Sequence, residues 1–194
     1  KINEWDLRDI TDISFAFSNI LYDNSTFNEK IGEWNVSNVS KMYQVCCCAK
    51  VFNQTLSKWD VSNVTTMKEM FENAETFNNG GSNGINNWDV SNVITMEKMF
   101  MNTKFDQPID LWNVSSVINM HRLFSGVNII GLLNTGYNPF NQNISGWDIS
   151  SVTNMDKLFF KNNKFNQNLS DWGNRFNSNV STNDMFFMAT SMKT

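Results

Sequence analysis

The sequence contains little proline, histidine or cysteine, and it lacks long apolar runs. Its 194 residues include two prolines, one histidine and three cysteines. Because no run of about 18 apolar residues exists, we expect no membrane span in this chain. One histidine without a paired nucleophile gives no basis for base-assisted catalysis. We therefore expect a protein that is not an enzyme and that uses no cofactor.

An excess of basic residues is also absent. The chain has 15 Lys and Arg against 19 Asp and Glu, for a formal net charge of -4. Phosphate binding requires a clustered basic face, so nucleic acid is not an expected partner. Hydrophobic residues make up 41% of the chain, enough for a continuous core, which excludes wholesale disorder.

What the sequence does have is an internal repeat centred on tryptophan. The unit reads [IL]-x-x-W-[DN]-[VI]-S-[NS]-V-x-x-M-x-x-[ML]-F, followed after a spacer by F-[ND]-Q. Its base period is 24–25 residues, with insertions lengthening some copies. The seven tryptophans are Trp5, Trp34, Trp59, Trp88, Trp112, Trp147 and Trp172. We expect one domain over residues 1–194, with about seven coils starting near Ile2, Ile31, Leu56, Ile85, Ile109, Ile144 and Leu169.

The spacing within one unit predicts a short strand and a short helix. Trp59 and Val61 alternate as in an extended segment, and Val64, Met67 and Met70 follow at helical spacing. Such a unit buries its apolar face only against its neighbours. The expected fold is therefore an α/β repeat solenoid with a parallel sheet on one side and helices on the other. Trp and Phe should form ladders in its core, and the Asx residues after Trp and in F-N-Q should bond turn backbone.

The motif W-[DN]-V-S-N-V-x-x-M-x-x-M-F with F-N-Q-x-[IL]-S resembles a short repeat of bacterial surface proteins. This repeat is grouped with the BspA-like leucine-rich-repeat proteins, as in mycoplasma and listeria lipoproteins, protists and giant viruses. The resemblance implies a leucine-rich-repeat-like solenoid on a surface-exposed protein that acts in adhesion or recognition. It implies no catalytic residue, because the repeat motif contains none.

Two further patterns contain residue types that are found in chemical sites. Cys46, Cys47 and Cys48 are consecutive, whereas a metal site requires spaced pairs, and Cys46 takes the place that Phe71 has in the next coil. We expect small buried substitutes, with a redox or inter-chain role left for a thiol that points outward. Asp or Asn follows six of the seven tryptophans, which offers too few carboxylates for calcium, so no metal site is expected.

The insertion at 126–139 is the preferred interaction site. An apolar segment in a projecting loop indicates a contact surface, although it can also fold back and cap the coil. Its candidate contact residues are Ile129, Ile130, Leu132, Leu133 and Tyr137. Two N-x-[ST] sequons lie off the repeat template, at Asn24 and Asn179, and would be glycosylated only on a eukaryotic secretory route.

These observations favour a non-catalytic surface module for adhesion or for protein or ligand recognition. The alternative is a structural subunit that assembles into a filament, a surface layer or a virion component. The expected partner is a protein or glycan on a surface, with self-association under the alternative. The expected location is the cell surface or the extracellular space. Because Lys1 and not Met begins the chain, we expect it to be a piece of a longer protein.

Overall fold

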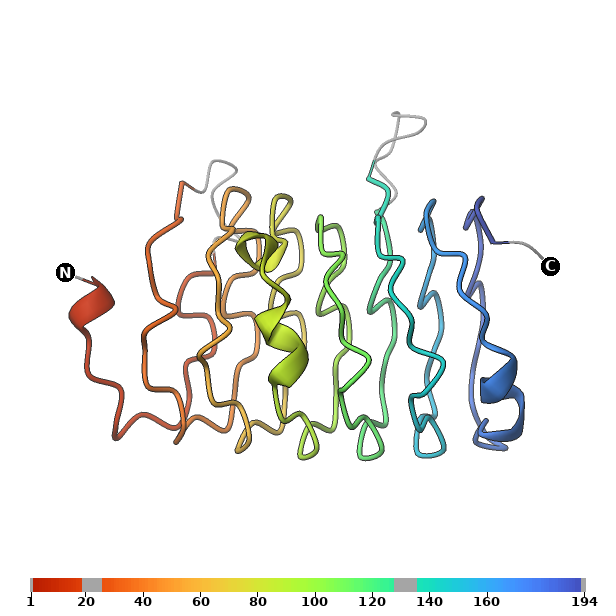
Figure 1. Cartoon of the computed structure of the whole chain (residues 1–194), viewed down its shortest axis with the longest axis horizontal. Coiled ribbons are helices and arrows are strands. Elements are labelled where there is room, and N and C mark those ends of the chain that lie inside the picture. The colour runs from red at the N-terminus through yellow and green to blue at the C-terminus, as the bar shows by residue number, and fades with distance from the viewer. Residues whose placement is uncertain (1, 19–25, 128–135, 193–194) are drawn as a thin grey trace.

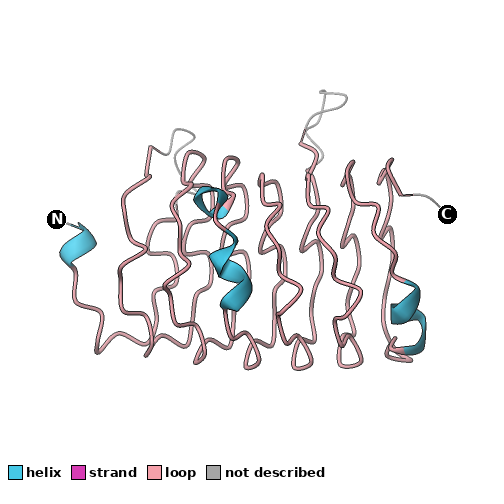
Figure 2. Cartoon of the chain, in the orientation of Figure 1, coloured by secondary structure: helices cyan, strands magenta, loops and turns pink. Residues whose placement is uncertain are grey.

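A computed structural model describes residues 2–18, 26–127 and 136–192. The chain winds into coils stacked along its long axis, with the two termini at opposite ends (Figure 1). Four short 3-10 helices are its only helices in these ranges. They are η1 (Ile2–Glu4), η2 (Asn79–Gly81), η3 (Asn83–Asn87) and η4 (Ser170–Asn174). Turns and irregular backbone make up the rest of the described chain (Figure 2).

The prediction of an α/β, leucine-rich-repeat-like solenoid is wrong. Across the described ranges, no segment forms a β-strand or an α-helix, and the longest helices, η3 and η4, have five residues each. The coils are instead joined through single residues in isolated parallel bridges. One series of bridges links Asp12 to Lys41, Lys41 to Thr66, Thr66 to Thr95, Thr95 to Asn119, Asn119 to Asn154, and Asn154 to Ser181, and a further bridge links Asn138 to Asn162. The coil is therefore not built from regular secondary structure.

The stretch that was expected to be a helix carries the backbone hydrogen bonds between coils. In residues 95–102, the N–H groups of Met96 and Lys98 donate to the carbonyls of Asn119 and His121, at 3.0 and 2.8 Å. Phe100 and Asn102 continue the series to Leu123 and Ser125, at 3.1 and 2.9 Å. We call such stretches ladder segments; they comprise residues 12–18, 41–48, 66–73, 95–102, 119–126, 154–161 and 181–188.

Consecutive tight turns explain why the Met-x-x-Met-Phe spacing resembles that of a helix. The N–H of Met99 donates to the carbonyl of Met96 at 3.1 Å, which closes a four-residue turn. Lys98, third in that turn, has a φ of 53°, and Asn102 has 55° four residues later. A positive φ at this place is the mark of a type II turn. The turns place apolar residues inward at a period close to that of a helix, yet leave alternate N–H groups for the next coil.

The stretch that was expected to be a strand is tied to its neighbours by side chains. The Trp112 indole N–H donates to the carbonyl of Ile85 in the preceding coil at 2.9 Å, and Trp147 repeats this bond to Ile109 at 3.1 Å. Trp112 is only 3% exposed. Trp5 differs from the other six, because it has no preceding coil in the described chain and is 57% exposed. The predicted Trp core is thus correct except at Trp5.

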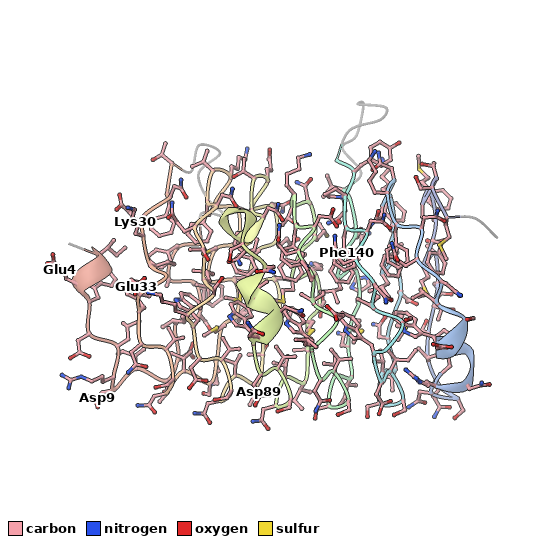
Figure 3. All side chains as sticks on the ribbon, in the orientation of Figure 1. Glu4, Asp9, Lys30, Glu33, Asp89 and Phe140 are labelled. Atoms are coloured by element: carbon pink, nitrogen blue, oxygen red, sulfur yellow. The ribbon has the colours of Figure 1, made fainter. Side chains whose placement is uncertain are left out.

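Two stacks of phenylalanine fill the interior beside the tryptophans. Phe124, from the Met-x-x-Leu-Phe stretch, stacks on Phe140, from F-N-Q, with ring centroids 3.8 Å apart. Phe140 in turn lies 6.1 Å from Phe105 and 6.3 Å from Phe165 in the adjoining coils. The side chain of Phe140 is fully buried among the windings (Figure 3). Because rings such as Phe140 stack on rings of both adjoining coils, a single coil cannot bury its aromatic residues by itself.

The F-[ND]-Q residues form a polar ladder along one edge of this core. Asn141 Oδ1 accepts the N–H of Asn166 at 2.9 Å and the amide of Gln167 at 3.0 Å. Asp106 Oδ1 receives the same two bonds from Asn141 and Gln142, each at 2.8 Å. Asp therefore replaces Asn freely, since only the acceptor oxygen is used. The expected ladder of F-N-Q side chains is present.

We predict that Trp112→Phe lowers the free energy of unfolding by about 1–3 kcal/mol, because it removes the indole bond to Ile85 and leaves a small void. Trp5→Phe is the matched control. It replaces an exposed indole that makes no such bond, and it should change the free energy of unfolding by less than about 0.5 kcal/mol. Urea unfolding followed by circular dichroism measures both, and equal effects would contradict the proposed role of the indole bond.

Candidate binding face

The ladder segments alternate inward and outward pairs of side chains. In residues 66–73, Met67, Met70 and Phe71 are fully buried in the core. Lys68 and Glu69, and then Glu72 and Asn73, lie outside the central apolar cluster. The inward residues repeat from coil to coil, whereas the outward ones change. We call the outward side chains the ladder face; its central members are Tyr43, Gln44, Cys47, Cys48, Lys68, Glu69, Glu72, Asn73, Glu97, Lys98, Met101, Asn102, His121 and Arg122.

A charged network crosses the coils in the middle of the ladder face. Lys98 Nζ lies 3.0 Å from Glu69 Oε1 and 3.8 Å from a Glu72 carboxylate oxygen. The Gln44 amide donates to the other Glu69 oxygen at 2.5 Å. In the same region Lys68 Nζ lies 3.1 Å from Glu97. Each pair joins neighbouring coils, so the network adds a side-chain connection beside the backbone ladder.

The pKa values of two carboxylates in this network, buried Glu69 and half-buried Glu72, are shifted in opposite directions. Burial by itself would raise the pKa of Glu69, but hydrogen bonds from Lys98 and Gln44 outweigh it and hold that pKa below its usual value. Glu72 makes a longer contact with Lys98, and burial raises its pKa. Glu69 therefore stabilises the coils as a carboxylate, whereas the ionised form of Glu72 is destabilising.

His121 lies at the edge of the same network. Its Nδ1 is 3.8 Å from Glu97 Oε1, and its N–H backbone group donates to Asn119 Oδ1 at 2.9 Å. Burial, more than any neighbour, lowers the pKa of the imidazole. Among the described residues, no group of three or more His, Cys, Asp or Glu side chains is arranged to hold a metal ion.

A groove of about 510 Å³ opens at the N-terminal end of the ladder face. The Phe15 ring meets the Tyr43 ring edge to face, with centroids 4.9 Å apart, and Phe15 is 53% exposed. Lys68 Nζ lies 5.9 Å from the centre of the Tyr43 ring. The remaining lining residues are polar or charged: Asp12, Ser14, Lys41 and Thr66. An exposed aromatic ring packed on a half-buried one, beside cations and hydroxyls, is an arrangement that can anchor a partner molecule.

The three cysteines divide by their place in the turn. Cys46 and Cys47 are buried, as expected for small substitutes, whereas Cys48 is partly exposed. Cys46 donates its N–H to the carbonyl of Met70 at 2.8 Å, which is the bond that Phe71 makes to Met99 in the next coil. All three are free thiols in this structure.

The proposed interaction loop is described only in part. Ile129, Ile130, Leu132 and Leu133 lie outside the described residues, as does the sequon at Asn24. Tyr137 is half-buried and lies with Lys104 and Asn102 along a cavity of about 380 Å³. Lys161 Nζ is 5.9 Å from its ring. Asn179 is exposed in the last coil, which keeps its side chain accessible.

The Asx residues after each Trp do not connect the coils. Asp60 Oδ1 accepts the N–H and the hydroxyl of Ser62, at 3.1 and 2.6 Å, within its own turn. Asp89 makes the same turn bond to Ser91 at 3.0 Å and lies at the lower edge of the stack (Figure 3). Its hydrogen bond from Ser91 lowers the pKa of Asp89. The connection between coils is made instead by residues such as Asn63, whose amide donates to the carbonyl of Ser37 at 2.7 Å.

Sequence reasoning missed the charged network of the ladder face. The signal was present in the repeat: Lys68 and Glu69 are matched, one unit later, by Glu97 and Lys98 with the charges exchanged. That signal becomes readable only once these positions are known to lie side by side in neighbouring coils.

One family model matches the chain, over residues 1–83 and 79–194. Its description is "Mycoplasma protein of unknown function, DUF285". The chain belongs to this family. No curated protein and no solved structure matches it. Within the described part of this DUF285 chain, no helix is long and apolar enough to cross a membrane.

We predict that Glu69→Gln lowers the free energy of unfolding at pH 7 by about 1–3 kcal/mol, because Lys98 loses its charged partner. The pKa of Glu69 is depressed, so its stabilisation is present above the unfolded pKa and is lost as pH falls through the folded one. The difference from the wild type should therefore shrink below about pH 4.5.

Glu72→Gln is the matched control, one turn along the same segment. It removes a buried charge that lacks a close partner, so stability at pH 7 should stay equal or rise. Urea unfolding at pH 7 and pH 4 measures both variants. A larger loss for Glu72→Gln than for Glu69→Gln would refute the assignment of the two carboxylates.

Proposed function

We propose that this DUF285 chain is a non-catalytic recognition module that binds a protein or glycan partner through its ladder face. The observation that carries the proposal is the groove of about 510 Å³ beside Phe15 and Tyr43. Its exposed aromatic ring is not used by the stack, since the ring lies outside the core cluster. A residue that serves only the fold would be buried like Phe71 or Phe100.

The difference between the inward and the outward side chains of the ladder segments supports the same proposal. Inward side chains hold a constant pattern, so the coils can be kept while the outward side chains change. Outside the ion pairs that join the coils, such as Lys98 with Glu69, a surface of this kind can vary for different partners while the core is kept. The positive and negative groups at the groove, Lys41, Lys68 and Asp12, add polar contacts around the aromatic pair.

We further propose that the chain belongs to the wider BspA-like group of surface repeats and is displayed at the cell surface. The support is the Trp-centred motif itself together with the match to a mycoplasma family. A repeat of this group that is displayed at the cell surface would serve to recognise a surface partner.

The test uses a glycan array and intact mammalian epithelial cells as probes for the fluorescently labelled chain. Phe15 has a φ of 63°, a conformation that asparagine accepts, so Phe15→Asn removes the ring and keeps the turn. We predict saturable binding by the wild type and at least a tenfold weaker affinity for Phe15→Asn.

Phe187→Asn is the control, because Phe187 is similarly exposed, at 54%, but belongs to the last coil, whereas the groove is lined by the first three coils. It should bind like the wild type. Absence of binding to both probes, or equal binding by the wild type and Phe15→Asn, would count against the proposal.

A second candidate function, a structural subunit, is favoured by the apolar ends of the stack. Trp5 lies at one end, 5.9 Å from Trp34 and without an indole bond of the kind that Trp34 makes to Ile2. At the other end a cavity of about 540 Å³ is lined by apolar residues that include Leu169, Trp172 and Phe186. The end of one copy that carries Trp5 would fit there as one more coil.

Light scattering coupled to size-exclusion chromatography separates the two functions. End-to-end assembly predicts a mass that grows with concentration and a return to monomer in Trp5→Ser. A wild-type monomer at every concentration rules the structural subunit out and leaves the recognition module untouched.

A further inference from the structure

Two neighbouring thiols on the ladder face are not required by the repeat. Cys47 and Cys48 occupy the places that Glu72 and Asn73 hold in the next coil, and that Met101 and Asn102 hold in the one after. The N–H of Cys48 donates to the carbonyl of Glu72 at 2.7 Å, as that of Asn73 does to Met101 at 2.9 Å. The backbone therefore accepts quite different side chains at this position, and packing alone does not call for sulfur.

The two thiols are in contact, and their surroundings differ. Cys47 Sγ lies 3.6 Å from Cys48 Sγ. Cys47 is 2% exposed, whereas Cys48 is partly exposed. The amide of Asn73, in the neighbouring coil, approaches Cys48 Sγ at 4.0 Å. Cys48 thus has a route to solvent and two donors that can stabilise a negative charge on its sulfur.

The turn holds Cys48 in place. Its φ is 61°, a left-handed conformation that is unfavourable for most non-glycine residues and that asparagine tolerates better. Its own N–H and the N–H of Ala49, which donates to the carbonyl of Cys46 at 3.1 Å, fix the backbone on both sides. The thiol is therefore presented in one orientation and not on a mobile loop.

We propose that Cys48 is a covalent modification site that forms a mixed disulfide with a small disulfide molecule, with Cys47 as the hydrogen-bond donor that positions and stabilises its thiolate. The thiolate attacks one sulfur of R–S–S–R, a Cys48–S–S–R bond forms, and the original bond breaks to release R–S⁻. The disulfide molecule is the electron acceptor, so no other oxidant is needed. The site lies on the ladder face but does not line the groove beside Phe15 and Tyr43, and the proposal does not rest on recognition there.

The electrostatics agree with this geometry. The hydrogen bond from Cys47 is the main reason that the pKa of Cys48 is lowered to about 7. Glu72 acts against the thiolate and Lys50 acts in its favour, so these two charges oppose each other. The pKa of Cys47 is raised, chiefly by its bond to Cys48, and burial raises the pKa of Cys46. Of the three thiols, only Cys48 is accessible as a thiolate near neutral pH.

The probe is cystamine, a small disulfide, added to the reduced 194-residue chain between pH 5 and 9. Intact mass and peptide mapping locate the adduct, and the rate gives a pH profile. We expect one adduct, at Cys48, with a profile midpoint near pH 7. At pH 6 the rate should exceed that of glutathione about fivefold, because the larger thiolate fraction outweighs the lower nucleophilicity of a less basic sulfur.

Three variants separate the roles of the two thiols. Cys48→Asn, which copies the neighbouring coils, should fold and lose the fast adduct. Cys47→Ser keeps a hydrogen-bond donor and should preserve the profile, whereas Cys47→Ala should move its midpoint up by about one pH unit. An adduct elsewhere, a fast adduct in Cys48→Asn, or a wild-type rate at pH 6 no greater than that of glutathione would overturn the proposal. The wild-type profile with its peptide map decides the matter even if a Cys47 variant fails to fold.

Discussion

The structure depends on backbone hydrogen bonds that run from one coil to the next. A coil of about 25 residues without a helix or a paired strand cannot satisfy its own N–H and C=O groups, and leaving them buried and unpaired costs about 1–3 kcal/mol each. The ladder segments solve this by sending every second N–H to the neighbouring coil and closing the others into tight turns. The side chains of the stack are likewise paired between neighbouring coils.

The side chains of a coil also find their partners in the neighbouring coils. The Trp112 indole donates to the carbonyl of Ile85. The Phe140 ring stacks on Phe105 and Phe165. The Asn141 side chain accepts hydrogen bonds from Asn166 and Gln167. The turns impose positive φ on residues such as Lys98 and Arg122, at a cost of roughly 1–2 kcal/mol each. The bonds between coils must offset that cost, which makes the fold dependent on stacking and not on local propensity. The outward side chains are less constrained by stacking than the inward ones, apart from ion pairs such as that of Glu69 with Lys98.

Much of this arrangement could be predicted from the sequence, but its backbone could not. The Trp period located the repeat, and the phase of Trp59, Val61 and Met67 identified the inward side chains correctly. The error arose because chained type II turns and an α-helix place apolar residues inward at nearly the same interval. In the ladder segments the residues at positive φ are Lys, Glu, Arg and Gln more often than Asn, and none is glycine, so the usual signal for such turns is missing. For the same reason, the backbone bonds between coils were expected at the Trp stretch, whereas the bridges lie in the ladder segments.

The candidate site was less predictable than the core. Tyr137 was chosen from an apolar insertion, whereas the groove combines Phe15, Tyr43 and Lys68 from three separate coils. These residues come together only in the register that the bridges set, with Asp12 beside Lys41 and Lys41 beside Thr66. No pattern within a single repeat contains that information.

Amide hydrogen exchange, followed residue by residue by NMR, tests the central claim most directly. The N–H groups of Met96, Lys98 and Phe100 are bonded across coils, whereas that of Ser91 is bonded only to Asp89 in an exposed turn. If stacking holds the backbone, the three ladder amides should exchange together and far more slowly than Ser91, because they open only when coils separate. Ladder amides that exchange as fast as Ser91 would contradict the account.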